Sequence, residues 1–322
     1  MRGSPGASVV EDDAAIARLF EAGRQRGLAR AISAAEAGVG AALAALFYER
    51  AGRAATVGLT GPPGVGKSTL CAALVTHVRR LGRTVGVVSV DPSSPFSHGA
   101  ILGDRIRLSD HFADAGVFIR SMASRGHLGG LAGATGDAVA FMDAFGLEVI
   151  FIETVGVGQS EIEIADLADT TLVALQPGSG DSVQLLKAGI LEVADVFVVN
   201  KADHPSALQL QREIRSTMEM LEYPGWVPEL VATRAREGTG VAELWDAVER
   251  HRAYLHESGD LERKRRTAFA HRVRALATGR LSVEIERRII DLSDGERARD
   301  PYRVADDIVA SFAMRDGAAG KA

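Results

Sequence analysis

The segment that most constrains the fold of this chain is GPPGVGKST, at positions 61–69. It satisfies the pattern G-x-x-x-x-G-K-[ST] between an apolar run and a stretch with helical periodicity, which is the context that a phosphate-binding loop requires. The glycines let backbone N–H groups approach a phosphate, and the positive end of the following helix attracts it. A chance glycine-rich turn is disfavoured by these flanks. The predicted phosphate-binding residues are Gly61, Pro62, Pro63, Gly64, Val65, Gly66, Lys67, Ser68 and Thr69.

Seven short apolar runs alternate with helical stretches between Ala55 and about Trp245, a pattern typical of βαβ units. Being almost wholly apolar, they are expected to be strands covered on both faces. The fold class predicted is therefore α/β, with a mostly parallel P-loop sheet flanked by helices. The expected strands are TVGLT, TVGVVSV, GVFIR, EVIFIE, TLVAL, VFVVN and LVAT.

Helical periodicity continues on both sides of this region. We expect an N-terminal helical extension over residues 1–52, a P-loop domain over 53–258 and a C-terminal helical dimerisation arm over 259–322. The basic run at Arg263–Arg266 has acidic neighbours, so it is interpreted as a solvated helix face rather than a nucleic-acid contact.

Carboxylates follow two of the predicted strands. Asp91 ends VVSV and Glu153 ends EVIFIE, and ligands bind beyond the carboxyl ends of strands in open parallel sheets. Both side chains are therefore candidates to hold Mg²⁺ together with the hydroxyl of Ser68. Glutamate is one methylene longer than aspartate, so Glu153 is expected to bind through a water. The alternatives are a turn cap at Asp91 and an ordinary strand-end carboxylate at Glu153.

Three further residues are candidates for the chemistry of phosphate transfer. Lys67 is expected to neutralise β- and γ-phosphate oxygens, and Gly156 in ETVG to donate its backbone N–H to a γ-phosphate. Asp104, between the second and third strands, is placed in a first mobile switch. It could orient the attacking water or a water on Mg²⁺, and Arg105 and Arg107 beside it could reach phosphate. The alternative is a surface salt-bridge cluster.

The tetrapeptide NKAD at Asn200–Asp203 follows a predicted strand and matches N-K-x-D. The carboxylate of Asp203 can accept hydrogen bonds from N1–H and the 2-amino group of guanine, whereas adenine offers neither donor. Such a site rejects the wrong base by roughly 10⁴-fold. The alkyl stem of Lys201 can lie on the purine face. The sequence therefore predicts GTP/GDP with Mg²⁺ as the ligand, and a loop covering the base edge is expected at Ala232, Thr233 and Arg234.

The position directly after the switch glycine is valine, Val157, where many fast GTPases carry glutamine. Gln159 lies two residues further along the chain. We therefore expect slow intrinsic GTP hydrolysis, with a partner or a second copy completing the site.

Charge and composition exclude some other functions. The formal net charge is −5, so nucleic acid or an anionic membrane is not expected as the main partner. The single cysteine, Cys71, is interpreted as buried packing, and no cysteine cluster is present for a structural metal. No apolar stretch approaches the ~20 residues that a membrane span needs. A cytoplasmic protein with protein partners is expected.

The motif set resembles the MeaB/ArgK/MMAA GTPases, chaperones of cobalamin-dependent acyl-CoA mutases. The resemblance covers most of the chain. It implies a P-loop GTPase of the signal-recognition and MinD-like class, a homodimer held by the C-terminal arm, and a role in gating adenosylcobalamin delivery to the mutase and protecting that enzyme. It rests on GLARAISAAE, GPPGVGKST, VDPSSPFSHGAILGDRIR, FIRSMASRGHLGGLA, ETVGVGQSE, LQPGSGDSVQLLKAGILEVAD and NKAD.

The resemblance also implies a third mobile switch over Gln176–Lys187. PGSGD provides a glycine-rich turn, and Lys187 follows on the first turns of a helix, so the loop could change position with nucleotide state and Lys187 is a candidate catalytic residue. The alternative is a surface loop with a solvated lysine. Ser182 stands where many relatives carry an acidic residue, and His98 where several have glycine.

Two other functions remain as alternatives. A P-loop small-molecule kinase would need an acceptor pocket and a general base, and NKAD argues against the usual preference of such kinases for ATP. A nickel-insertion GTPase would need metal ligands, but His77, His111 and His127 are scattered. The identity of the mutase stays open among methylmalonyl-, isobutyryl- and hydroxyisobutyryl-type enzymes.

Overall fold

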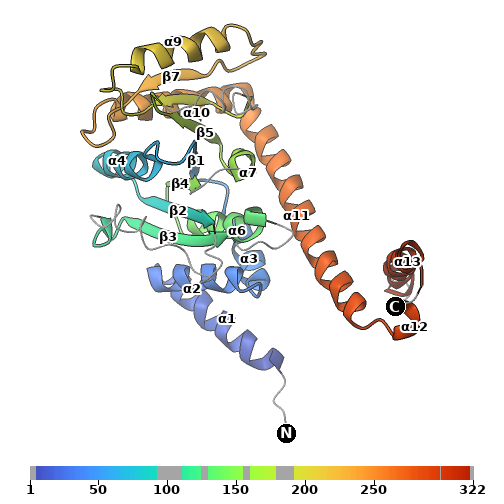
Figure 1. The fold of residues 1–322 in the computed structure, drawn as a ribbon. Coiled ribbons are helices and arrows are strands. Elements are labelled where there is room, and N and C mark those ends of the chain that lie inside the picture. Colours follow the sequence, from blue (N-terminus) through green and yellow to red (C-terminus); the bar gives the residue numbers. More distant parts are fainter. Residues whose placement is uncertain are drawn as a thin grey trace. The chain divides into compact units, whose positions relative to one another are not determined.

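A computed structural model describes residues 5–92, 111–124, 130–154, 160–178, 192–297 and 299–319. The chain divides into two compact units (Figure 1). The larger comprises Met1–Gly126 with Gly130–Arg272, and the smaller comprises His127–Gly129 with Val273–Ala322.

The larger unit contains a sheet of seven described strands in the order β3-β2-β4-β1-β5-β6-β7. Every pairing between these strands is parallel. The predicted α/β class and all seven predicted strands are thus confirmed. The strands are β1 (Ala55–Thr60), β2 (Val85–Pro92), β3 (Val117–Ser124), β4 (Val149–Thr154), β5 (Thr170–Leu175), β6 (Val196–Val199) and β7 (Glu229–Ala232).

Helices cover both faces of this sheet, which explains why the strands are apolar without alternation. On one face, Val57 and Leu59 pack with residues of α4 and α10. On the other, α6 and α7 cover one half, and α9 covers β5 and β6. The helices of this unit are α1 (Pro5–Glu21), α2 (Gln25–Glu36), α3 (Ala41–Phe47), α4 (Lys67–Arg80), α6 (Gly130–Ala144), α7 (Ser160–Leu167), α9 (Ala207–Met218) and α10 (Val241–Ser258), with the 3₁₀ turn η1 (Tyr48–Arg50).

The N-terminal helices belong to the core of the larger unit. Phe20 of α1 stacks on Phe47 of α3 with ring centroids 4.1 Å apart, and both rings pack edge-on against Phe141 of α6. Such aromatic pairs add stabilisation beyond the apolar area that they bury. The helical periodicity predicted here is confirmed.

The interpretation of Arg263–Arg266 as a solvated face is wrong for half of the run. Lys264 forms an ion pair with Asp195 at 2.9 Å, and Arg265 does so with Asp169 at 2.9 Å. Arg263 and Arg266 are about three-quarters exposed. The error arises because the partners lie far away in the sequence, at the ends that begin β5 and β6.

Helix α11 (Asp260–Ile290) starts in the larger unit and continues into the smaller one, which also contains α12 (Asp294–Arg297) and α13 (Pro301–Ala319). The predicted helical C-terminal region is therefore present. None of the helices in the described ranges combines the length and apolar character that crossing a bilayer requires. The predicted boundaries after residues 52 and 258 stay predictions.

Candidate functional site

The GPPGVGKST segment connects the end of β1 to the start of α4. Gly61 has a φ of +138°, and a Cβ placed there would lie 2.1 Å from the carbonyl oxygen of Ala174 on β5. Gly64 and Gly66 also have positive φ values, and a Cβ on Gly66 would lie 2.8 Å from Nδ2 of Asn200. Only glycine allows this close approach in these backbone conformations.

Lys67 begins α4 and is buried, with 7% of its surface exposed. Its Nζ donates to the carbonyl oxygens of Gly61 at 2.5 Å and Pro62 at 3.1 Å. The ammonium group therefore lies within the curve of the loop, at the positive end of α4, where a phosphate would be bound.

Ser68 and Glu153 meet at the carboxyl ends of neighbouring strands. The Ser68 hydroxyl donates to Oε1 of Glu153 at 2.5 Å, and the two residues are 5% and 1% exposed. They come together because β1 pairs with β4, which sets Leu59 opposite Glu153. A hydroxyl and a carboxylate are hard oxygen donors of the kind Mg²⁺ prefers. These two residues fit a magnesium ion beside the phosphate-binding loop.

Asn200 joins three segments through one buried amide group. Its Nδ2 donates to the carbonyl oxygen of Val65 at 2.8 Å. Its Oδ1 accepts from Thr233 Oγ1 at 3.1 Å and from the backbone N–H of Ala235 at 3.2 Å. The phosphate-binding loop, the NKAD segment and the segment after β7 are thereby held in one arrangement.

Lys201 adopts a left-handed backbone with φ of 55°, unique among the described non-glycine residues. Its Nζ donates to the carbonyl oxygen of Gly64 at 2.7 Å and to Oε1 of Gln176 at 2.6 Å. Its side chain thus spans from the NKAD segment to the phosphate-binding loop. Asp203 is exposed and faces the same pocket.

A cavity of about 910 Å³ contains most of these side chains. The phosphate-binding loop lines one part, together with Glu153, and Asn200, Lys201, Asp203 and Arg234 line the rest. Thr233 lies behind the lining, with its N–H bonded to the Val199 carbonyl and no exposed surface. Ala232 ends β7. Most of the predicted phosphate and base residues therefore line one cavity.

Four further residues line this cavity that the sequence analysis did not single out. They are His204, Ala235, Arg236 and Glu237. His204 follows the NKAD motif directly, and the other three follow the predicted base-edge loop within three residues. That adjacency was the signal available in the sequence.

Several predicted site residues cannot be placed. Asp104, Gly156 and Lys187 lie outside the described residues, as do Arg105, Arg107, Val157, Gln159, His98 and Ser182. Asp91 is the second-to-last residue of β2, and only its backbone is described. Their roles stay predictions.

Cys71 is fully buried in the core beside the site, as predicted. Burial, and to a lesser extent the charge of Glu153, raises the pKa of its thiol. The thiol is therefore protonated and unreactive at neutral pH. Among the described side chains, no three His, Cys, Asp or Glu residues come together as they do in a metal site.

Comparison with known proteins agrees with the geometry of this site. The family model described as methylmalonyl-CoA mutase-associated GTPase MeaB matches residues 28–288. This chain belongs to that family. It is therefore a GTPase, and its family binds guanine nucleotides.

Individual relatives support the same assignment. A protein of Pyrococcus horikoshii named as a GTPase is 46% identical over 84% of this chain and 88% of its own length. The mitochondrial methylmalonic aciduria type A homolog of Mus musculus is 38% identical over 66% of this chain and 52% of its own. A crystal structure titled LAO/AO transport system kinase has a TM-score of 0.69, 24% identity, and coverage of 97% and 99% of the two chains, which shows the shared fold.

Proposed function

We propose that this MeaB-family GTPase is a metallochaperone-type switch protein that gates adenosylcobalamin delivery to a cobalamin-dependent acyl-CoA mutase and protects that enzyme. The observation that carries the proposal is the match over residues 28–288 to a family described by its association with methylmalonyl-CoA mutase. The match includes every residue that lines the P-loop cavity, which supports one chain carrying both GTP hydrolysis and the proposed chaperone role.

The proposed hydrolysis uses the residues gathered at the carboxyl edge of the sheet. Lys67 would leave its loop carbonyl partners to neutralise β- and γ-phosphate oxygens. Ser68 and Glu153 would hold Mg²⁺, Glu153 through a water, and the ion would supply charge neutralisation at the phosphates. Asp91 is proposed to join them, Gly156 to contact the γ-phosphate, and Asp104 and Lys187 to act as switch or catalytic residues.

A physical route from nucleotide to client is supported by Lys201. Its ammonium bonds both to Gly64 of the phosphate-binding loop and to Gln176, which begins the proposed third switch, Gln176–Lys187. Guanine binding would place the alkyl stem of the same lysine against the purine. The nucleotide and the switch would therefore compete for, or share, one side chain.

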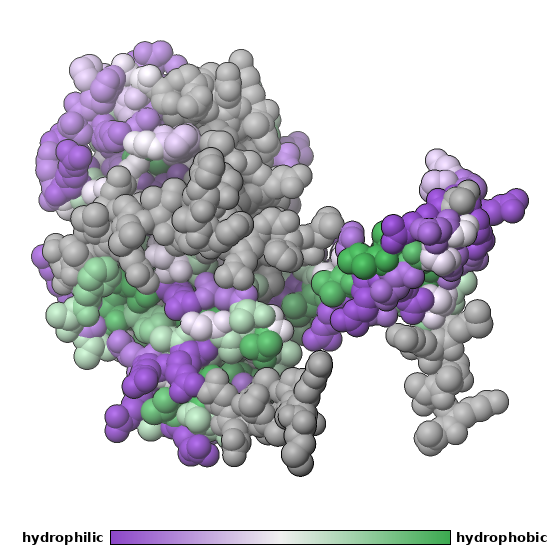
Figure 2. Space-filling view, turned by 60° about the horizontal axis from the view of Figure 1, so that its bottom comes forward, coloured by the Kyte–Doolittle hydropathy of each residue, from purple (hydrophilic) through white to green (hydrophobic). Residues whose placement is uncertain are grey.

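We also propose that the C-terminal arm holds a homodimer. On the smaller unit, exposed apolar side chains recur along α11 at Val273, Leu276, Val283 and Ile290. Figure 2 shows these C-terminal helices, at the right of the view, carrying hydrophobic residues between hydrophilic ones. Spacings of three and seven residues put them on one side of the helix, and exposed apolar surface of this kind marks an interface.

The client is tested by capture in defined nucleotide states. The full chain, immobilised and loaded with GDP or a non-hydrolysable GTP analogue, is incubated with purified methylmalonyl-CoA mutase. Capture that depends on the nucleotide, with stimulated GTP turnover, is the expected result. A Lys67→Ala variant should lose the nucleotide dependence. Absence of capture and of stimulation by methylmalonyl-, isobutyryl- and hydroxyisobutyryl-type mutases would overturn the chaperone role and leave the GTPase intact.

The intrinsic rate is a separate test of the proposed timing role. The isolated protein should hydrolyse GTP slowly, because position 157 holds valine rather than a water-orienting glutamine. Turnover of the isolated protein above about 1 s⁻¹, comparable to a stimulated GTPase, would contradict this proposal.

A further inference from the structure

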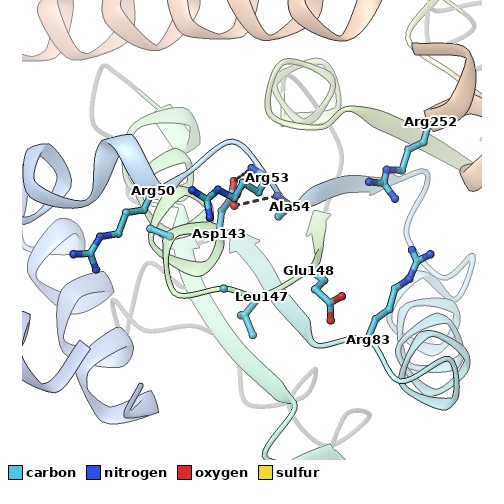
Figure 3. A pocket seen from close by; sticks show the side chains of 10 residues that line it. Arg50, Arg53, Ala54, Arg83, Asp143, Leu147, Glu148 and Arg252 are labelled. Carbon is cyan, nitrogen blue, oxygen red and sulfur yellow. Dashed lines mark hydrogen bonds between the residues drawn. The ribbon is translucent and has the colours of Figure 1, made fainter. Parts of the chain in front are cut away.

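A second pocket of about 730 Å³ opens at the opposite edge of the sheet from the nucleotide cavity (Figure 3). Its lining includes residues that immediately precede strands: Ala54 before β1, and Leu147 and Glu148 before β4. Arg83 lies two residues before β2. Strands of six residues extend about 20 Å, so a ligand here would not touch a nucleotide at the carboxyl ends.

Arginines from three separate segments of the chain line this pocket. Arg53 precedes β1, Arg83 lies between α4 and β2, and Arg252 belongs to α10. Figure 3 shows Arg83 and Arg252 extending from opposite sides towards one space, whereas Arg50 points away from them. Arg50 instead forms an ion pair with Glu21 at 3.2 Å.

Arg83 and Arg252 share a single carboxylate oxygen. Both donate to Oε1 of Glu249, at 2.6 and 3.4 Å. Each guanidinium carries five N–H donors in a planar fork, so one shared oxygen leaves both with donors available to an anion. Arg83 also lies over the buried ring of Trp245, 5.7 Å from its centroid. That contact fixes its orientation and reduces the entropy lost when a ligand binds.

The two acidic residues of the pocket are occupied by backbone groups. Asp143 is 8% exposed and accepts the backbone N–H groups of Gly52, Arg53 and Ala54, which fixes the segment that carries Arg53. Glu148 Oε2 accepts the N–H and the hydroxyl of Thr84 at 2.8 and 3.1 Å. Glu148 is exposed to the pocket and retains a second oxygen, which suits a hydroxyl donor rather than another anion.

We propose that this pocket binds a small phosphorylated molecule that also carries hydroxyl groups, of the sugar-phosphate class. Its phosphate accepts from the donors of Arg83 and Arg252 that do not bond to Glu249, with Arg53 at the rim, and a hydroxyl donates to Glu148. Arginine forks match phosphate oxygens in pairs. The volume falls in the range of small-molecule sites, about 300–1,000 Å³.

The test uses the full chain preloaded with GDP and Mg²⁺, so that the phosphate-binding loop is filled. Ribose 5-phosphate is titrated into it by calorimetry, with inorganic phosphate as the second probe. One equivalent of ribose 5-phosphate should bind, and more tightly than phosphate. The double variant Arg83→Gln/Arg252→Gln should weaken binding at least about tenfold. Glu148→Gln should weaken ribose 5-phosphate more than phosphate.

Two controls keep the test decisive. Arg50→Gln removes an arginine of the same pocket that points away, and binding should stay within about twofold of wild type. Retained GDP binding shows that the double variant is folded. Arg53→Gln changes an exposed side chain at the rim and should weaken ribose 5-phosphate binding by a few-fold. Absence of saturable binding, equal loss in Arg50→Gln, or tighter binding of a hexaglutamate peptide than of ribose 5-phosphate would overturn the proposal.

Discussion

Asp203 is the side chain that we propose selects the base. It faces the nucleotide cavity from the segment that Asn200 and Lys201 fix to the phosphate-binding loop. The carboxylate is proposed to accept hydrogen bonds from two guanine donors, N1–H and the 2-amino group. Replacing one of its oxygens by an amide NH₂ reverses the polarity of one of these two bonds.

The Asp203→Asn variant should therefore change specificity from GTP to XTP. Xanthine keeps N1–H but carries a carbonyl at C2, which the new amide can donate to. Affinity for GDP should fall by about 10²–10⁴-fold, while XDP affinity should exceed that of wild type. Competition of GDP and of XDP with a fluorescent nucleotide measures the two affinities. Equal loss of the two nucleotides would show that Asp203 supports the loop rather than reading the base.

His251 is a second residue whose surroundings predict a measurable effect. It is 1% exposed, with Nδ1 2.9 Å from Thr170 Oγ1 and Nε2 3.3 Å from Asp195 Oδ1. Burial lowers its pKa from 6.5 to about 4, although Asp195 and Asp169 act in the opposite direction and Lys264 adds to the lowering. The histidine is therefore neutral in the native protein at neutral pH.

Because the pKa of His251 is lower in the folded chain, the unfolded chain binds the proton first as pH falls. Its contribution to stability is intact above pH 6.5 and is lost towards pH 4, by about 2 kcal/mol between pH 7 and pH 5. His251→Gln should remove the histidine's share of this pH dependence and keep the share that comes from carboxylates. Urea unfolding gives the free energy of unfolding of the wild type and the variant at pH 7 and pH 5. The difference between the two proteins should change by about 2 kcal/mol between these pH values. Parallel pH profiles would contradict the assignment.

The first turns of α11 are attached to the sheet by charged side chains. Arg265 forms two bonds to the Asp169 carboxylate, at 3.0 and 2.9 Å, and also donates to the carbonyl oxygens of Gly52 and Ala54. The hydrogen bond to Asp169, opposed by burial, raises the pKa of Arg265. This side chain therefore ties together the segments that begin β1 and β5.

Arg265→Ala should lower the free energy of unfolding by about 2 kcal/mol, because it leaves the nearly buried Asp169 without its cation. Arg266→Ala is the matched control. Arg266 is 75% exposed and, within the described part of the chain, pairs with the exposed Glu262 along the helix, so its loss should change stability by less than about 0.5 kcal/mol. Urea denaturation compares them. Similar values for the two variants would mean that α11 is not anchored through Arg265.

The same pair of residues marks the limit of what the sequence could predict. Strands, the phosphate-binding loop and the guanine motif were predicted because each depends on residues adjacent in the chain. Arg265 and Arg266 look alike in ERKRR, yet Arg265 binds the carboxylate of Asp169, 96 positions away, whereas Arg266 pairs with Glu262 one helical turn away. The arginine pocket and the environment of His251 likewise depend on which strand ends lie side by side, and local patterns do not encode that.

At the scale of the whole molecule, the two compact units differ in how they bury apolar side chains. The larger unit has extensive cores on both faces of its sheet. Among the described apolar residues of the smaller unit, Ile308 alone is buried. On α11, exposed fractions of 38% or more are found for Val273, Leu276, Val283 and Ile290. Apolar surface left open in this way favours association with a second copy.

The homodimer proposal therefore predicts that charge on this side of α11 separates the copies. The double variant Val273→Asp/Val283→Asp should sediment as a monomer at concentrations where the wild type is a dimer, because each interface would bury unpaired carboxylates. Thr278→Asp adds a carboxylate on the opposite side of the helix, since five residues from Val273 correspond to about 140°. That control should remain dimeric with unchanged GDP binding. A monomeric wild type, or equal dissociation in both variants, would show that this side of α11 is not the dimer contact.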